Sequence, residues 1–132
     1  MLVKQISIFL ENRPGQLAKA CRALAASNVN IVTLSLADTT DFGIVRMILD
    51  DHVKGFEVLS KAGFAVRETE VVMASVADRP GGMAELMEKL DKADVDIEYS
   101  YAYALGNSDK AVLIFKFKDN AKAEAALEGP KV

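Results

Sequence analysis

Residues Glu11–Leu17 read ENRPGQL, and residues Asp78–Met83 read DRPGGM. In both stretches an amide or acidic residue precedes Arg-Pro-Gly, and an apolar residue follows two places after the glycine. Arg13 and Arg79 are 66 positions apart, which is half of the 132 residues. Self-similarity at a fixed period indicates a repeat architecture. The chain is therefore predicted to contain an internal duplication.

The residues around the two copies of this motif also agree. A strand-like run precedes each copy, at Val3–Leu10 and at Val71–Val76. A helical pattern follows each copy, because apolar residues recur there at the three-and-four spacing of an amphipathic helix. Each helix is followed by a similar phrase that opens a second strand, Val29–Ile31 and Val95–Ile97. The helical apolar positions are Leu17, Ala20, Cys21 and Leu24 in the first copy and Met83, Leu86, Met87 and Leu90 in the second.

The remaining elements complete the pattern β-α-β-β-α-β, which is that of a ferredoxin-like sandwich. We predict the α+β class, with two tandem ferredoxin-like sandwiches at residues 1–69 and 70–132 and antiparallel sheets that carry helices on one face. The second copy lacks or replaces its last strand, so another strand, from this chain or a second copy, is expected along Val71–Val76. The further predicted elements are the third strands (Ile44–Leu49, Val112–Phe117), the second helices (Val53–Ala62, Ala121–Glu128) and, in the first copy only, a fourth strand (Phe64–Thr69).

The composition excludes several classes of function. With 51% hydrophobic and 27% charged residues the chain should fold as a globular protein, and its net charge of −3 argues against nucleic acid or an anionic membrane as a partner. One cysteine, Cys21, and one histidine, His52, leave no set of ligands for a structural zinc and no disulfide. No apolar run is long enough for a signal peptide or a membrane span. We expect a cytoplasmic protein with no metal and no cofactor.

The repeated loop has the chemistry of an anion site. Pro14 and Pro80 fit the first position of a helix, where the missing N–H would have had no partner. Gly15 and Gly81 leave the backbone uncovered by a side chain. The expected result is a bare helix N-terminus with free N–H groups, which suits a carboxylate. The alternative is that Arg-Pro-Gly only turns a strand into a helix.

At these residues the sequence resembles the ACT domain, a small-molecule regulatory module attached to many enzymes of amino-acid metabolism. The resemblance rests on LENRPGQL followed by NVNI, and it covers the chain as two tandem copies. It implies that a free amino acid binds at an interface between two domains. The loop before the first helix would supply one Asx residue, and the second strand of the facing domain would supply another.

The positions that match are Asn12 and Asn30 in the first copy, and Asp78 and Asp96 in the second. Neutral amides donate and accept, whereas ionised carboxylates only accept and would repel a ligand carboxylate. The first copy is therefore the favoured site and the second the weaker one, and capping of the following helix is the alternative role for Asp78. The first site comprises Leu10, Asn12, Arg13, Pro14, Gly15, Gln16, Leu17, Asn30 and Ile31; the weaker one comprises Asp78, Gly81 and Asp96.

One of these positions departs from the family pattern. Some ACT domains have a histidine where this chain has Leu10. A ligand contact of that kind is therefore absent, although Leu10 stays within the predicted site. No residue is assigned a catalytic role.

Two stripes of side chains suggest further interfaces. Tyr99, Tyr101 and Tyr103 alternate along the second strand of the second copy, which places them on one face as core, interface or pocket floor. In the first copy, Val32, Leu34 and Leu36 share the parity of Asn30, so a regular strand would put them on the face away from Ile31. The missing last strand and this apolar stripe both point to a homodimer.

The resemblance implies a non-catalytic sensor. It would bind a free L-amino acid at an interface between ACT-like domains and shift the arrangement of the domains or the activity of a partner enzyme. The alternative is a ligand-free subunit that binds and regulates an amino-acid biosynthetic enzyme. Catalysis is disfavoured because no acid-base pair, metal-ligand cluster or phosphate loop is present. An RNA-binding module is disfavoured because the chain is acidic and Ile44–Leu49 has no aromatic residue.

Overall fold

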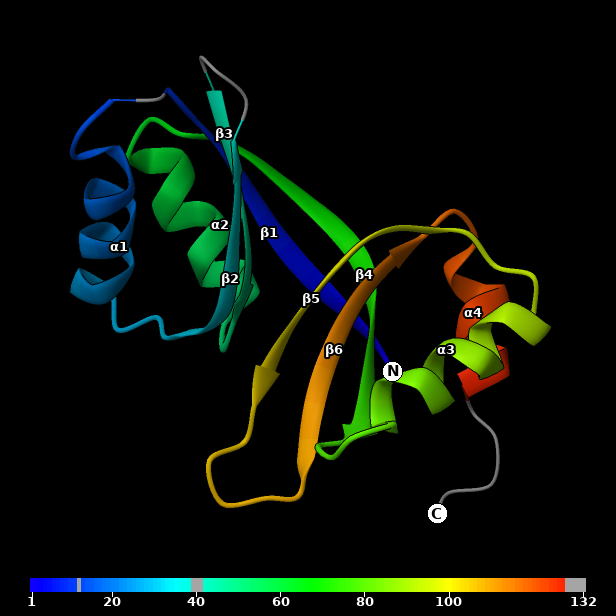
Figure 1. Ribbon diagram of the computed structural model, residues 1–132. Helices are drawn as coiled ribbons and strands as arrows, with labels where there is room; N and C mark the ends of the chain where they lie inside the picture. The colour runs from blue at the N-terminus through cyan, green and yellow to red at the C-terminus, as the bar shows by residue number, and fades with distance from the viewer. Residues whose placement is uncertain (12, 39–41, 128–132) are drawn as a thin grey trace. The chain divides into compact units, whose positions relative to one another are not determined.

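The computed structural model describes residues 1–11, 13–38 and 42–127 (Figure 1). Strands and helices alternate in the predicted order, so the predicted α+β fold with tandem ferredoxin-like sandwiches is confirmed. The elements are β1 (Leu2–Glu11), α1 (Gln16–Ala26), β2 (Ile31–Asp38), β3 (Phe42–Leu49), α2 (His52–Lys61), β4 (Ala65–Ala77), α3 (Gly82–Lys92), β5 (Ile97–Ala104), β6 (Lys110–Phe117) and α4 (Asn120–Leu127).

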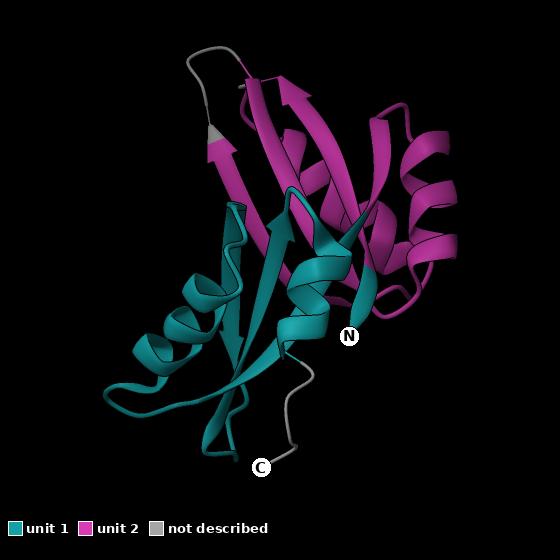
Figure 2. Ribbon diagram, turned by 90° about the vertical axis from the view of Figure 1, so that its right-hand side faces the viewer, with its two compact units in different colours: residues 1–3, 70–132 teal, residues 4–69 magenta. Residues whose placement is uncertain are grey.

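The chain divides into two compact units, coloured separately in Figure 2. The N-terminal unit is Lys4–Thr69, and the C-terminal unit combines Met1–Val3 with Glu70–Val132. The boundary therefore falls inside β1 and inside β4, and each of these strands contributes residues to both units. The assignment of domains to residues 1–69 and 70–132 stays a prediction.

In the N-terminal unit the strand order is β2-β3-β1-β4, and α1 and α2 lie on one face of the sheet (Figure 1). Both β1 and β2 pair with β3 in antiparallel fashion. Burial of apolar side chains between the sheet and the helices holds the unit together. The core comprises Ile6, Ile8, Leu10, Ala20, Leu24, Val29, Val45, Met47, Leu49 and Leu59.

The C-terminal unit repeats this arrangement with α3 and α4 over the sheet. The start of β1 is followed across the sheet by β4, β6 and β5, and β6 is antiparallel to both of its neighbours β4 and β5. Phe115 and Phe117 stack in its core with ring centroids 5.1 Å apart. The core comprises Val72, Val76, Leu86, Leu90, Leu113, Phe115, Phe117 and Ala123.

The strands predicted at Phe64–Thr69 and Val71–Val76 are one continuous strand, β4. The open edge expected in the second copy is paired by the start of the same chain. Met1 N donates to Met73 O at 3.2 Å, and Met73 N donates to Met1 O at 2.8 Å. Exchange of both backbone bonds is typical of an antiparallel pair. The chain thus supplies the covering strand, so this edge gives no reason to expect a dimer.

The two Arg-Pro-Gly loops form β-turns, and the prediction that their prolines begin the helices is wrong. The helices begin two residues later, after Gly15 and Gly81 in the left-handed conformation (φ 88° and 87°). Gln16 N donates to Arg13 O at 3.5 Å, which closes the first turn. Proline followed by a glycine at positive φ is the pattern of a type II turn. The glycine is therefore needed for its conformation and not only for an uncovered backbone.

A β-bulge changes which face the second strand of each unit presents. The register steps from Ile31 opposite Leu49 to Leu34 opposite Met47, with an irregularity before Thr33. The bulge adds one residue, so Leu34 and Leu36 share the core face with Ile31. The prediction that they lie on the opposite face is wrong, because the strand is not regular.

The same bulge occurs in the C-terminal unit, between Ile97 and Tyr99. Beyond it, Tyr99 lies opposite Lys116 and Tyr101 lies opposite Ile114. Ser100, which lies between them, is opposite the core residue Phe115. The tyrosines therefore share one face, as predicted, and it is the face away from the core phenylalanines.

Candidate functional site

A small hollow lies where β1 ends and α1 begins, within the N-terminal unit. It encloses about 110 Å³, below the roughly 300–1,000 Å³ of pockets for drug-sized ligands. Five of its residues belong to the predicted first site or to the motif itself, and two come from β2 and β3. The lining residues are Leu10, Glu11, Arg13, Gln16, Leu17, Leu36 and Gly43.

The apolar wall of this hollow comes from Leu10, Leu17 and Leu36. Leu10 is buried in the core and Leu17 packs against that core, whereas the side chain of Leu36 remains 51% exposed. The bulge in β2 turns Leu36 to this face, and a β-carbon at Gly43 would lie 3.1 Å from Leu36 Cδ1. Because Gly43 has no side chain, the side chain of Leu36 can lie next to this position. The wall suits an aliphatic group.

The polar rim carries one ion pair. Arg13 Nε lies 2.8 Å from Glu11 Oε2, and Arg13 N donates to Glu11 O at 2.7 Å. Both side chains are more than 60% exposed. Exposed pairs of this kind are worth about 1 kcal/mol or less, so a ligand can replace either partner at small cost. The rim therefore presents one cation and one anion side by side.

The N-terminus of α1 adds positive potential to the hollow. Its N-cap is Gly15, its first turn has no acidic residue, and its first helical bond runs from Lys19 N to Gly15 O at 2.9 Å. Within the described residues, no group accepts a hydrogen bond from the backbone N–H of Leu17 or Ala18. Free N–H groups at a helix start favour an anion.

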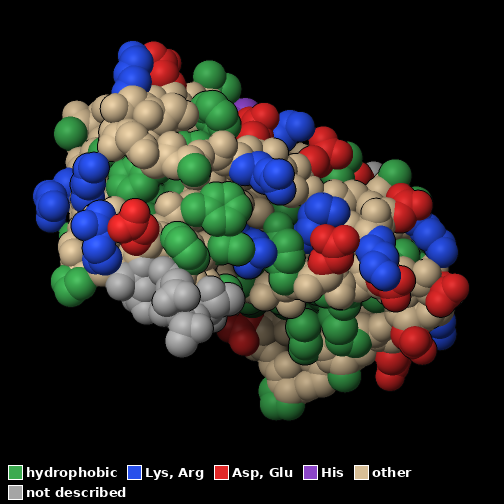
Figure 3. All heavy atoms as spheres, turned by 90° about the horizontal axis from the view of Figure 1, so that it is seen from above, with side chains coloured by type: hydrophobic (Ala, Val, Ile, Leu, Met, Phe, Trp, Pro, Cys, Tyr) green, Lys and Arg blue, Asp and Glu red, His purple; other side chains and the backbone are tan. Residues whose placement is uncertain are grey.

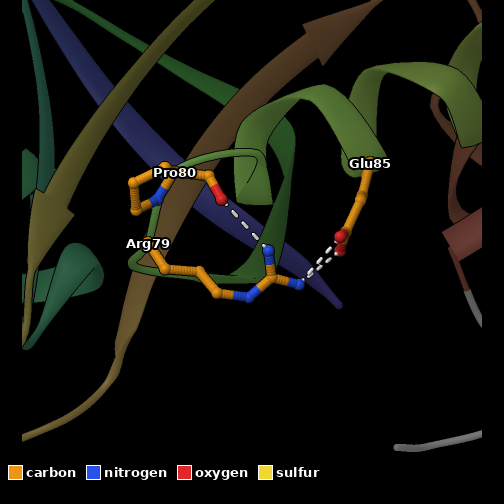
Figure 4. Close-up of polar contacts among 3 residues, drawn as sticks. All are labelled: Arg79, Pro80 and Glu85. Carbon is orange, nitrogen blue, oxygen red and sulfur yellow. Dashed lines mark hydrogen bonds and ion pairs between the residues drawn. The ribbon is translucent and has the colours of Figure 1, made fainter.

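The corresponding loop of the C-terminal unit is closed by its own side chains (Figure 4). Arg79 Nη2 donates to both oxygens of Glu85, at 2.8 and 2.9 Å, and Arg79 Nη1 donates to Pro80 O at 3.1 Å. Glu85 lies in the first turn of α3, so its charge already meets the positive end of that helix. The guanidinium lies across the turn, and Nη1 would be 3.6 Å from a β-carbon at Gly81.

Further differences separate the two loops. Gly82 occupies the place of Gln16, and a β-carbon there would lie 2.0 Å from Ala77 O. Ala77 stands where the first copy has Glu11, so the carboxylate that pairs with Arg13 has no counterpart at position 77. Helix α3 therefore starts tightly against the end of β4.

The sequence profile of the ACT domain pair matches residues 1–128. The chain belongs to this family. A structure of protein BT0572 from Bacteroides thetaiotaomicron is similar, with 37% identity, a TM-score of 0.91, and coverage of 97% of this chain and 88% of that one. No curated protein sequence matches the chain.

Regulatory subunits of aspartate kinase from two Thermus species share the fold. The ligand-free subunit from Thermus thermophilus has 17% identity and a TM-score of 0.67. The subunit from Thermus flavus has 15% identity and a TM-score of 0.62. Each alignment covers 96% of this chain and 93% of the subunit. These subunits thus share the fold of this ACT domain pair.

The residues predicted from the ACT resemblance do not all meet in one unit. Asn12 lies outside the described residues. Asn30 N donates to Asp50 Oδ1 at 2.9 Å, and the neighbouring Ile31 lies opposite Leu49. Gly43, which lines the hollow, is six residues from Leu49 along β3. Six residues of a strand span about 20 Å. Within this unit Asn30 cannot reach the hollow, so its contribution from a facing ACT domain stays a prediction.

The weaker site shows the same separation. Asp78 N donates to Asp109 O at 2.7 Å, and Asp96 O accepts from Lys118 N at 3.1 Å. Asp96 immediately precedes β5, just as Asn30 immediately precedes β2. The N-cap of α3 is Gly81, so the alternative role of Asp78 as N-cap is wrong.

The sequence did not indicate Glu11, Leu36 or Gly43 as site residues. Glu11 lies inside the repeated motif, and the second copy has Ala77 at the same position. This difference in charge between the two copies could have identified Glu11 as a site residue. The bulge that turns Leu36 toward the hollow has no signature in the letters, because Val32 and Thr33 suit any strand. Gly43 could have been noticed as a glycine at the start of a strand, which marks a close approach.

Other classes of site find little support in the part of the chain that the structure describes. It contains no group of three or more His, Cys, Asp or Glu side chains that could hold a metal ion. None of its helices is long and apolar enough to cross a membrane. On the face seen in Figure 3, acidic side chains lie among basic ones. This face lacks the continuous basic area that nucleic acid requires.

Proposed function

We propose that this ACT domain pair is a non-catalytic sensor that binds a free L-amino acid in the hollow beside Arg13. The observation that carries the proposal is the combination, in one small hollow, of an aliphatic wall, an exposed ion pair and an open helix N-terminus. A zwitterion with an aliphatic side chain has the complementary chemistry. Family membership supports the same class of ligand.

The rim suits the two charges of the ligand. The carboxylate would accept from the N–H groups of Leu17 and Ala18 and from the guanidinium of Arg13, as anions do at helix starts. The ammonium would replace Arg13 as the partner of Glu11. The Glu11–Arg13 pair would open without leaving either charge unpaired.

The size of the hollow limits the ligand. Its volume of about 110 Å³ is well below the roughly 300–1,000 Å³ of pockets that hold drug-sized ligands. The wall of Leu10, Leu17 and Leu36 offers no polar side chain to a ligand. A small aliphatic amino acid is therefore favoured over an aromatic or imidazole one.

Regulation would follow from a second ACT domain that closes over the bound amino acid. The facing domain, in a homodimer of this chain, would contribute Asn30 from the start of its β2. Binding would then shift the population toward the closed arrangement by as much as the ligand prefers it. An enzyme of amino-acid metabolism that senses this arrangement would be the partner.

The test is a thermal-melt screen against the twenty L-amino acids at millimolar concentration. A ligand at a hundred times its dissociation constant stabilises the folded state by about 2.7 kcal/mol. For a chain of this size that is a rise of several degrees. We expect a selective rise with small aliphatic amino acids. A flat screen would overturn the proposal in favour of a ligand-free interaction subunit.

A further inference from the structure

The two Arg-Pro-Gly loops differ in charge at one position of the helix that follows. This position is Lys19 in α1 and Glu85 in α3, each six residues after the arginine of its loop. The turns themselves are almost identical, because their glycines have φ 88° and ψ −10° in one copy and φ 87° and ψ −14° in the other. The backbone therefore does not explain why one loop is open and the other closed.

The side chain at this position decides where the arginine goes. In the C-terminal unit Glu85 takes both Nη2 bonds of Arg79 and holds the guanidinium across the start of α3 (Figure 4). In the N-terminal unit a cation stands there, and the Lys19 ammonium lies 5.3 Å from the centre of the Phe64 ring. Arg13 has no carboxylate on the helix and pairs with Glu11, which precedes it.

We propose that the residue at this position determines which repeat accepts a ligand, with Glu85 acting as an internal anion that closes the second loop. This inference rests on the proposed function, because it concerns which copy of the site is used. The carboxylate of Glu85 satisfies the arginine that a ligand carboxylate would otherwise meet. Lys19 leaves the equivalent arginine at the rim of the hollow.

The contacts of Arg79 favour a closed second loop. A ligand there would have to displace the Glu85 carboxylate, whose two oxygens both accept from Nη2. The pair is largely exposed, so its strength alone is modest, but the charge of Glu85 would also repel a ligand carboxylate. Position 77 is an alanine, so a ligand ammonium would also lack the carboxylate that Glu11 offers in the first loop. Arg13 also pairs with a carboxylate, that of Glu11, but this carboxylate lies at the rim of the hollow, where a ligand ammonium can take the place of Arg13. One occupied site per chain is the expected stoichiometry.

The test places an acidic residue at the open loop. Lys19→Glu gives Arg13 the partner that Arg79 has, whereas the matched control Lys19→Gln removes the ammonium and its contact with Phe64 without adding a carboxylate. Both variants are compared with wild type in titrations with glycine and with the L-amino acids alanine, valine, leucine and isoleucine. We expect Lys19→Glu to weaken binding at least tenfold and Lys19→Gln to weaken it less than threefold. Equal losses in the two variants would overturn the inference.

A second readout separates this inference from the proposed function. The NMR signals of the arginine Nε–H and guanidinium groups report whether Arg13 is held across the helix start. In Lys19→Glu the Arg13 signals should become as protected from exchange with water as those of Arg79, and in Lys19→Gln they should not. If wild type binds no amino acid, the proposed function fails and these signals decide the inference alone. Unchanged Arg13 signals in Lys19→Glu would overturn it.

Discussion

Gly82 lies so close to Ala77 that a β-carbon at position 82 would be 2.0 Å from the Ala77 carbonyl oxygen. The neighbour is backbone, which cannot swing aside as a flexible side chain can. In the first copy the same position carries Gln16, a full-length side chain that lines the hollow. This difference gives α3 a tighter start than α1.

The first prediction compares these two positions. Gly82→Ala should destabilise the protein by about 2–3 kcal/mol, because overpacking against fixed backbone forces a local shift. Gln16→Ala removes a half-buried side chain that lines the hollow, leaves no overpacking, and should change stability by less than about 0.5 kcal/mol. Urea unfolding of both variants measures the difference. Equal stabilities would show that α3 does not start tightly against β4.

The second prediction concerns the type II turn. Gly15→Ala should cost about 1–2 kcal/mol, because an L-residue at φ 88° is strained although no atom lies within 4 Å of the added methyl group. Gly106→Ala is the matched control, since that glycine also has open space but not a positive φ. If the two variants are equally stable in urea, the left-handed geometry of Gly15 is wrong.

How far the sequence predicts the fold can be seen from the repeat itself. The apolar spacings around Leu17 and Met83 are strong signals, and they place the helices to within a residue or two. The first turn was misplaced because proline fits both the start of a helix and the second residue of a β-turn, and only the φ of Gly15 separates them. Edge pairing of Met1 with Met73 joins residues far apart in sequence, which no local pattern encodes.

Only the part of the site that lies in the repeated motif was predictable from the sequence. The motif supplies Arg13, Gln16 and Leu17, because residues adjacent in sequence stay together in a loop. Leu36 comes from a strand whose facing depends on a bulge, and periodicity assigned it to the wrong side. The participation of Asn12 and Asn30 stays a prediction from the family resemblance.

The third prediction tests the charged rim. Arg13→Ala should weaken binding of the amino acid about tenfold or more, because a ligand carboxylate loses a charge-assisted hydrogen bond. Arg79→Ala is the control in the second loop and should leave affinity within twofold of wild type. Isothermal titration calorimetry measures both. A loss of affinity in Arg79→Ala as large as that in Arg13→Ala would contradict the placement of the ligand in the first repeat.

The fourth prediction tests the aliphatic wall. Leu36→Ala should reduce affinity for an aliphatic amino acid by about 1 kcal/mol, roughly the transfer energy of one or two methylene groups. Val32→Ala, on the same strand and also exposed, does not touch the hollow and should leave affinity unchanged. If both variants bind the amino acid as tightly as wild type does, Leu36 does not contact the ligand.

The fifth prediction follows from the family positions. Asn12→Ala should weaken binding more than Asp78→Ala, since the amide can serve both charges of the ligand and the carboxylate repels one of them. Calorimetry with the same amino acid gives both values. Equal or reversed losses would remove Asn12 from the site.

The most direct test of the account is a two-dimensional amide NMR titration of the wild-type protein with small aliphatic L-amino acids. The backbone N–H groups of Leu17 and Ala18 should shift strongly and saturate together, while those of Met83 and Ala84 at the start of α3 should stay in place. Saturation of both helix starts, or of neither, would contradict the claim that the first Arg-Pro-Gly loop is the single amino-acid site of the chain.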